Sequence, residues 1–195
     1  MINYHMRNYN NHTAMTKSQY GVTDISNNTT RNIKLISEMH PFFKNHIKCT
    51  NKNRKKGILD ETVARTIMAM YFMSDWKKEL TEVLKYIDKN ATDEHFLHLR
   101  ENLDRLSKVS DRSVQDLFNT TNTYIWLTVF DRFTKIDVKD DIFIRFMQAF
   151  KESLHSRIID GKSYDTVNNR NTKDKATVLG KIEMITILMY DYLHV

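Results

Sequence analysis

Residues 93–106, with the sequence DEHFLHLRENLDRL, carry the clearest helical pattern in this chain. Apolar side chains recur there at intervals of three and four residues, and they are Phe96, Leu99, Leu103 and Leu106. Such spacing puts them on one face of a helix, and Asp93 stands where a helix begins. Most of the other residues are charged or polar, which suits a face exposed to water. The stretch predicts an amphipathic helix that packs on a core by one side.

The same period repeats on both sides of this stretch. Apolar residues at helical spacing fall in the segments 33–43, 63–70, 76–87, 114–118, 124–133, 142–154 and 178–192. Asp60 and Asp75 are expected to mark the starts of two of these helices. The last helix is expected to open at Asn171 or Thr172, with Asp174 in its first turn. Because it is apolar on nearly all of its circumference, it is predicted to lie at the centre of the bundle.

The composition also favours helices. Four Gly and one Pro among 195 residues leave few of the residue types that hairpins and long loops need, and 41% of the residues are hydrophobic. We therefore predict an all-α fold, a single multi-helix bundle formed by residues 31–195, that needs no cofactor to fold. Residues 1–30 are polar, rich in Asn and Thr, and lack a helical apolar period, so they are predicted to form a flexible arm.

Positive charge is concentrated in the N-terminal third. Residues 1–57 hold ten Lys or Arg and two acidic residues, a balance of 10 − 2 = +8, whereas the rest of the chain has a balance of 20 − 22 = −2. A predicted loop at residues 51–57 carries most of the densest group, which is Lys48, Lys52, Arg54, Lys55 and Lys56. These five are the candidate nucleic-acid-binding residues, because phosphates are the commonest partners of such a cluster. The alternative is a solvated loop without a partner.

Cysteine content and hydropathy limit the cellular compartments in which the protein is expected. Cys49 is the single cysteine, so it can form neither an internal disulfide nor a thiolate zinc cluster. No run of 18 apolar residues occurs, and no apolar segment follows the polar N-terminus. We expect a soluble protein without a membrane partner, in the cytoplasm of a bacterial cell or of a virus-infected host cell.

Three groups of residues are candidates for reactive or metal sites. His95 and His98, one helical turn apart, could bind a transition metal, but solvated histidines are the simpler interpretation. The acidic group Asp137, Asp140 and Asp141 could hold Mg²⁺, although carboxylates before a helix commonly complement its dipole. Cys49 lies among basic residues that could lower its pKa. None of these groups predicts a catalytic or metal site.

Two further patterns have a structural and a functional interpretation. One is the aromatic stripe Trp126, Phe130 and Phe133, and the other is the methionine group Met68, Met70 and Met73. Stripes of this kind usually form core, and a binding groove lined by Met is the alternative. The chain has no phosphate-binding glycine loop, nucleophile elbow or zinc-protease motif.

The order of several short motifs resembles the helical half of the GmrSD-type restriction endonuclease family. The motifs are Arg31-Asn32, Met39-His40-Pro41-Phe42-Phe43, Ile67, the Leu103/Leu106 helix, Tyr164, Thr172-Lys173-Asp174-Lys175 and Lys181-Ile182. In that family a ParB-like α/β domain comes first, with an Asp-Gly-Gln-Gln-Arg motif associated with nucleotide hydrolysis. The helical region then starts with a Glu-x-Arg-Asn signature, and many members carry a His-rich, metal-dependent nuclease module at the C-terminus.

This chain departs from the family at its functional motifs. Thr29 stands where the Glu of the signature would be, and Asp160-Gly161 lacks the Gln and Arg that would follow. The nuclease module has no counterpart in these residues. The resemblance therefore implies a helical module without either catalytic centre. Because the metal-ligand and nucleophile candidates are weak as well, the chain is predicted not to be an enzyme.

Three functions remain open at this point. The first is a non-enzymatic, nucleic-acid-associated helical module related to restriction and defence proteins, which contacts the phosphates of nucleic acid or of a nucleoprotein complex. The second is an anti-defence protein of a phage or mobile element that inhibits a host defence complex through protein contacts. The third is an enzyme whose site the sequence does not reveal.

Overall fold

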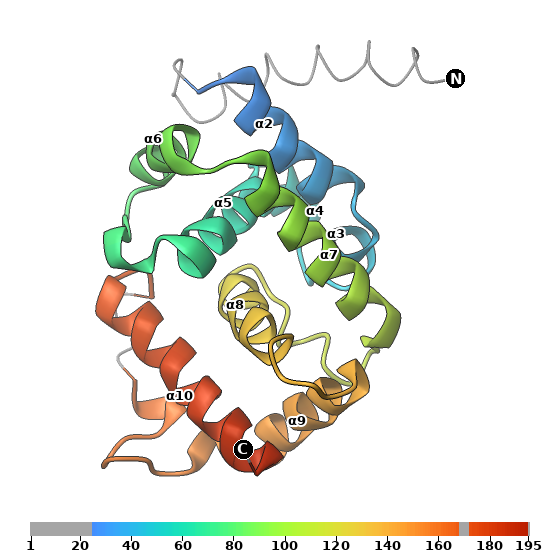
Figure 1. Ribbon diagram of the computed structural model, residues 1–195, viewed down its shortest axis with the longest axis vertical. Coiled ribbons are helices and arrows are strands. Elements are labelled where there is room, and N and C mark those ends of the chain that lie inside the picture. Colours follow the sequence, from blue (N-terminus) through green and yellow to red (C-terminus); the bar gives the residue numbers. More distant parts are fainter. Residues whose placement is uncertain (1–24, 168–171, 195) are drawn as a thin grey trace.

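The structure is a computed structural model that describes residues 25–167 and 172–194. Its α-helices in chain order are α2 (Asn27–Lys34), α3 (Pro41–Asn45), α4 (Asn51–Lys55), α5 (Ile58–Tyr71), α6 (Leu80–Asn90), α7 (Asp93–Val109), α8 (Thr123–Phe133), α9 (Asp140–Glu152) and α10 (Lys175–Leu193). A π-helical turn and three 3-10 turns add Leu35–Met39, Met73–Asp75, Leu154–Ser156 and Tyr164–Thr166. In the described part of the chain the only β-type pairings are two isolated bridges. The predicted all-α bundle is confirmed (Figure 1).

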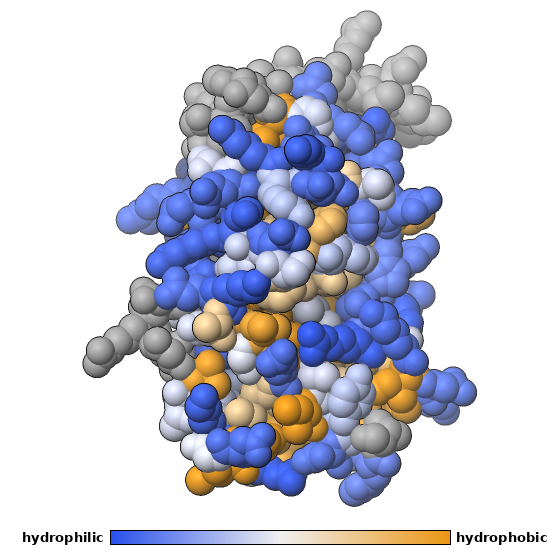
Figure 2. All heavy atoms as spheres, turned by 60° about the vertical axis from the view of Figure 1, so that its left-hand side comes forward, coloured by the Kyte–Doolittle hydropathy of each residue, from blue (hydrophilic) through white to orange (hydrophobic). Residues whose placement is uncertain are grey.

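Helix α8 lies at the centre of the bundle. Ten of its eleven residues are buried, and both α5 and α10 pack against it (Figure 1). The prediction that the last helix would be central is wrong, because one face of α10 meets water. Ile187 on that face is 42% exposed, and apolar side chains reach the surface in the lower part of the view in Figure 2. A helix that is apolar nearly all round can thus still have a solvent-facing side.

Aromatic packing joins α8 to α9. The Trp126 ring lies 5.0 Å from that of Phe150, and the Phe130 ring lies 5.0 Å from that of Phe143, both edge to face. Such pairs add to the stability that burial of the rings supplies. Trp126, Phe130 and Phe133 are fully buried, which confirms the interpretation of this stripe as core. Of the methionine group, Met68 is fully buried, while Met70 and Met73 pack against the core from its edge.

Two of the predicted helix starts are wrong, and one is nearly right. Asp75 ends a 3-10 turn, and α6 begins at Leu80 after an extended linker. Asp60 lies inside the first turn of α5, which starts after Gly57. Gly57 adopts a φ of 72°, a left-handed conformation that glycine tolerates best. At α10 the helix begins at Lys175, so Asp174 takes the capping position rather than a place within the first turn.

Asp60 is held in a buried ionic network. Only 2% of the residue is exposed, and its Oδ2 lies 2.7 Å from the Lys34 ammonium, while Ser37 donates a hydrogen bond to its Oδ1. Burial alone would lower the pKa of Lys34, but pairing with Asp60 and Glu38 outweighs burial and raises it. Lys34 and Ser37 come from α2 and the π-helical turn, so the network ties the N-terminal segment to α5.

Asp60→Ala is expected to destabilise the fold by about 3 to 5 kcal/mol, because it leaves the buried Lys34 ammonium without its main counter-charge. Urea denaturation at pH 7 measures the change. The control is Asp141→Ala, which breaks an exposed pair with Arg145 and removes a carboxylate from the first turn of α9, and it should cost about 1 kcal/mol or less. Equal losses in the two variants would contradict a special role for the buried network.

The domain begins earlier than predicted. Ile25 is 6% exposed, α2 starts at Asn27, and the Ser26 side chain accepts a hydrogen bond from the Thr29 amide as the N-cap. Residues 25–30 therefore belong to the domain rather than to a flexible arm, and residues 1–24 of the predicted arm lie outside the described residues. Among the described helices, none is long and apolar enough to cross a membrane.

Candidate nucleic-acid interface

Residues 41–57 form a continuous surface element that we call the basic segment. It contains six Lys or Arg, namely Lys44, Lys48, Lys52, Arg54, Lys55 and Lys56, and it contains no Asp or Glu. Apolar side chains fix its first half to the core, since Phe42 and Phe43 are fully buried and Ile47 is 3% exposed. The Lys48 amide also donates a hydrogen bond of 2.9 Å to the Phe118 carbonyl. The segment is thus a surface anchored by its own side chains and backbone.

The second half of the basic segment is helical rather than the predicted loop. Thr50 caps the N-terminus of α4, where its hydroxyl accepts a hydrogen bond of 3.2 Å from the Asn53 amide. Gly57, in its left-handed conformation, ends the turn and leads into α5. The sequence carried both signals, a threonine cap and a terminal glycine, but α4 has no buried residue and so no apolar period reveals it.

The structure places four of the five predicted contact residues at the surface. Lys48, Lys52, Lys55 and Lys56 are exposed. Arg54 is half-buried, and its Nη2 donates a hydrogen bond of 3.3 Å to the Phe43 carbonyl, so it braces α4 against α3. Lys44 on α3, which the sequence did not single out, is exposed as well.

The charge of the basic segment is poorly compensated. Lys44, Lys48, Lys52 and Lys56 form no ion pair with any described residue. Elsewhere in the described chain many cations lie within 4 Å of a carboxylate, among them Lys34, Arg65, Lys78, Arg105, Lys135, Arg145, Lys151, Arg157 and Lys173. What distinguishes the basic segment is that its lysines follow one another closely in a stretch without any acidic residue.

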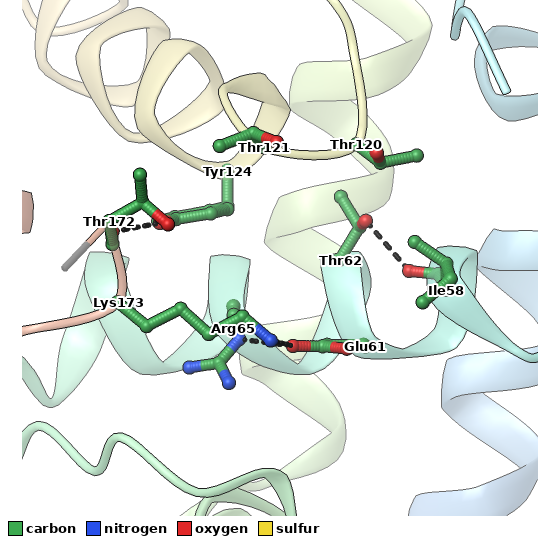
Figure 3. A pocket seen from close by; sticks show the side chains of 9 residues that line it. All are labelled: Ile58, Glu61, Thr62, Arg65, Thr120, Thr121, Tyr124, Thr172 and Lys173. Atoms are coloured by element: carbon green, nitrogen blue, oxygen red, sulfur yellow. Dashed lines mark hydrogen bonds and ion pairs between the residues drawn. The ribbon is translucent and has the colours of Figure 1, made fainter. Parts of the chain in front are cut away.

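A polar pocket of about 170 Å³ opens where the basic segment meets α5 (Figure 3). Its walls come from three places: the first two turns of α5, the turn before α8 together with Tyr124, and the residues that precede α10. They are Ile58, Glu61, Thr62, Arg65, Thr120, Thr121, Tyr124, Thr172 and Lys173. Hydroxyl, carboxylate and ammonium groups thus gather around one small space.

Glu61 is the ionic centre of this pocket. Its Oε1 accepts from Arg65 Nε at 2.8 Å and from Lys173 Nζ at 2.6 Å (Figure 3). Burial alone would raise the pKa of Glu61, but the hydrogen bonds and charges of Lys173 and Arg65 outweigh burial and lower it. The carboxylate is therefore charged at neutral pH.

Arg65 and Lys173 are themselves held in place. Arg65 is 2% exposed, donates from Nη2 to the Lys78 carbonyl at 2.8 Å, and lies over the Trp76 ring at 5.7 Å. The Trp76 indole N–H donates in turn to the Lys173 carbonyl at 2.8 Å. No sequence pattern predicted this pocket. The spacing of Glu61 and Arg65, four residues apart inside a predicted core helix, was the one signal for it, whereas Lys173 is brought in by the tertiary fold.

Glu61→Gln is expected to make the free energy of unfolding depend less steeply on pH in acid. Folding lowers the pKa of Glu61, so the ionised carboxylate stabilises the folded protein. This stabilisation is fully present above the pKa of the unfolded chain, near 4.5, and is lost as pH falls through the lower pKa of the folded protein. The urea midpoint of the parent should therefore fall more steeply below about pH 5 than that of the variant. Glu82→Gln, at an exposed position of α6, is the control and should keep the parent's slope. Parallel acid limbs for parent and Glu61→Gln would refute the assignment.

The two histidines line one pocket beside Tyr71, but their polar contacts differ. His95 Nδ1 accepts a hydrogen bond of 2.9 Å from the Thr92 amide and completes a capping box at the start of α7. His98 Nε2 lies 2.6 Å from Asp131 Oδ1, which also accepts from Asn102 at 3.0 Å. In the described part of the chain, no three His, Cys, Asp or Glu side chains are grouped as metal ligands.

Two residues of the acidic group pair with arginines, while Asp137 is exposed. Both oxygens of Asp140 accept from Arg105, at 2.6 and 3.0 Å, and Asp141 accepts from Arg145 at 2.9 Å. Asp140 and Asp141 occupy the first turn of α9, the position that complements the helix dipole. The expectation that acidic residues before this helix serve its dipole is confirmed for these two.

Cys49 does not have the lowered pKa that its basic neighbours suggested. Burial raises the pKa of the thiol, and the nearby Arg54 guanidinium opposes this only in part. A thiol with a raised pKa is less ionised at neutral pH and is a weaker nucleophile.

Comparisons with family models, curated proteins and solved structures find no match for this chain. The relationship to the GmrSD-type family therefore stays a prediction. Of the residues on which it depends, Asn32 donates a hydrogen bond of 2.7 Å to Asp93 and joins α2 to α7, and the Lys181 ammonium lies 5.1 Å from the centre of the Tyr164 ring. Both contacts hold the bundle together.

Proposed function

We propose that this protein is a non-enzymatic nucleic-acid-binding module that contacts phosphates through its basic segment. The observation that carries the proposal is the set of six Lys or Arg in residues 41–57, a segment that contains no acidic residue. Within it Lys44, Lys48, Lys52 and Lys56 are exposed and form no ion pair with a described residue. A duplex or a single strand presents a dense row of negative charges that such a surface attracts.

The anchoring of the segment supports the same function. Phe42, Phe43 and Ile47 hold α3 and the following turn on the core, so the lysines extend from a fixed backbone. Binding then orders only the side chains, and the entropic cost is smaller than for a disordered basic tail. Because Arg54 braces α4, the contacts are assigned to Lys44, Lys48, Lys52, Lys55 and Lys56.

The non-enzymatic part of the proposal is supported by the local contacts of the reactive groups. His95 completes a helix cap, His98 lies against Asp131, and Asp140 and Asp141 pair with arginines, while burial raises the pKa of the Cys49 thiol. The predicted link to restriction and defence proteins belongs to this proposal and depends on the sequence resemblance alone.

Titration of the purified protein with labelled duplex and single-stranded oligonucleotides at two salt concentrations tests the function. We expect binding at low ionic strength that weakens steeply as salt is added, because each neutralised phosphate releases counterions. Absence of binding at low salt would refute the proposal. An inhibitor of a defence complex, acting through protein contacts, would then be the better hypothesis.

A further inference from the structure

The polar pocket adjoins the basic segment at two points. At one of them the Lys48 amide donates a hydrogen bond to the Phe118 carbonyl, and Lys48 forms an isolated bridge with Asn119, the residue before the two threonines of the pocket wall. On another side Lys56 and Gly57 lead directly to Ile58, the first residue of α5. Lys173, about half exposed, stands at the pocket as a further cation.

The dimensions of the pocket restrict its occupant. A protein cavity of about 150 Å³ accommodates benzene, so a space of 170 Å³ has room for one six-membered ring and not for a base together with its sugar. Thr121 on its wall is exposed, so the space is open to the surface. An occupant would enter as a single ring that projects from something larger outside.

The chemistry of the walls suits a heterocycle with both hydrogen-bond donors and acceptors. Glu61 accepts, Lys173 donates, and the hydroxyls of Thr120 and Thr121 can do either, while Ile58 supplies apolar contact (Figure 3). The tyrosine ring of Tyr124 forms part of the wall above α5 in that view. With Arg65 and Lys173 against Glu61, the pocket has a net positive charge, which favours a ligand attached to phosphate.

We propose that this pocket receives one unstacked pyrimidine base of a single-stranded nucleic acid whose phosphates contact the basic segment. This inference depends on the proposed function and makes it more specific. A pyrimidine base is a single six-membered ring whose edge carries hydrogen-bond donors, which are N–H or amino groups, and carbonyl acceptors. A purine has a second ring. A base paired within a duplex is stacked and cannot project, so the pocket distinguishes single strands from duplexes.

The test uses 12-nucleotide oligomers of uridine, thymidine and adenosine, a mixed duplex, and uridine monophosphate. We expect the parent to bind the uridine and thymidine oligomers about tenfold more tightly than the adenosine oligomer, since one inserted base contributes on this scale. A uridine oligomer whose nucleotides are replaced by abasic sites should lose that advantage. The uridine and thymidine oligomers separate RNA from DNA, and the monophosphate tests whether a free nucleotide suffices.

Thr121→Trp, which blocks an exposed wall of the pocket, should abolish the preference for pyrimidine while leaving duplex binding and its salt dependence unchanged. Thr81→Trp, at an exposed site of α6, is the matched control and should behave as the parent does. Equal affinity of the parent for pyrimidine, adenosine and abasic oligomers would overturn the pocket assignment while leaving phosphate binding intact. Failure of the parent to bind any oligomer would instead refute the proposed function itself. Should Thr121→Trp not fold, the abasic oligomer decides.

Discussion

A variant with Lys48, Lys52 and Lys56 replaced by alanine should fold normally and bind nucleic acid on the order of 100-fold more weakly at low salt. Each of these side chains is exposed, and none forms an ion pair with a described residue, so little folding free energy depends on them. Five phosphate contacts predict a slope of about −4 when the logarithm of the affinity is plotted against the logarithm of the salt concentration. Loss of three should reduce the magnitude of that slope by about 2 to 3, and fluorescence anisotropy at several salt concentrations measures both quantities.

The control removes the same charge from another place. Lys85, Lys89 and Lys108 are exposed on α6 and α7, and their triple alanine variant has the same net charge as the first. If binding depends on total charge alone, both variants weaken equally and the basic segment is not the interface. If only the first variant weakens, and does so to a similar degree for different duplex sequences, the contacts are to phosphates.

The helical pattern predicted the fold class because it depends on local spacing. The face formed by Phe96, Leu99, Leu103 and Leu106 is buried as the period requires. The centre of the bundle could not be predicted in the same way, since α8 and α10 are both apolar on most sides. Aromatic residues of α9 pack edge to face against α8, and such a contact between separate helices leaves no mark in the local spacing of either.

The starts of two helices were predicted wrongly for a related reason. Asp60 and Asp75 are residue types that cap helices, but tertiary contacts gave them other partners. Asp60 is drawn into α5 because Lys34 and Ser37, more than twenty residues earlier in the chain, approach it in the core. A sequence pattern contains no signal for that meeting.

For the same reason, only part of the candidate site could be predicted from the sequence. The basic residues were predicted because they are neighbours in sequence. The hydrogen bond from Arg54 to the Phe43 carbonyl was not predicted, because it joins two short helices across a turn. The polar pocket combines residues from α5, from the turn before α8 and from the approach to α10. No local pattern unites Glu61 with Lys173, so their ion pair could come only from the structure.

Ile182→Asp should leave no folded population at 25 °C in aqueous buffer. The Ile182 side chain is fully buried in α10, and the contacts of α10 with α8 cover this face. Truncation of such a side chain costs several kcal/mol, and a buried carboxylate without a partner adds several more, which together approach the whole stability of an ordinary domain. Circular dichroism and urea denaturation measure the outcome.

Ile187→Asp makes the same chemical change one and a half helical turns away and is the control. Because Ile187 is 42% exposed, its carboxylate can stay hydrated, and the cost should be about 1 kcal/mol or less. The two variants have identical composition, so any difference between them reports the orientation of α10 alone. A folded Ile182→Asp protein beside an unfolded Ile187→Asp protein would mean that the helix is rotated and that α8 meets its other face.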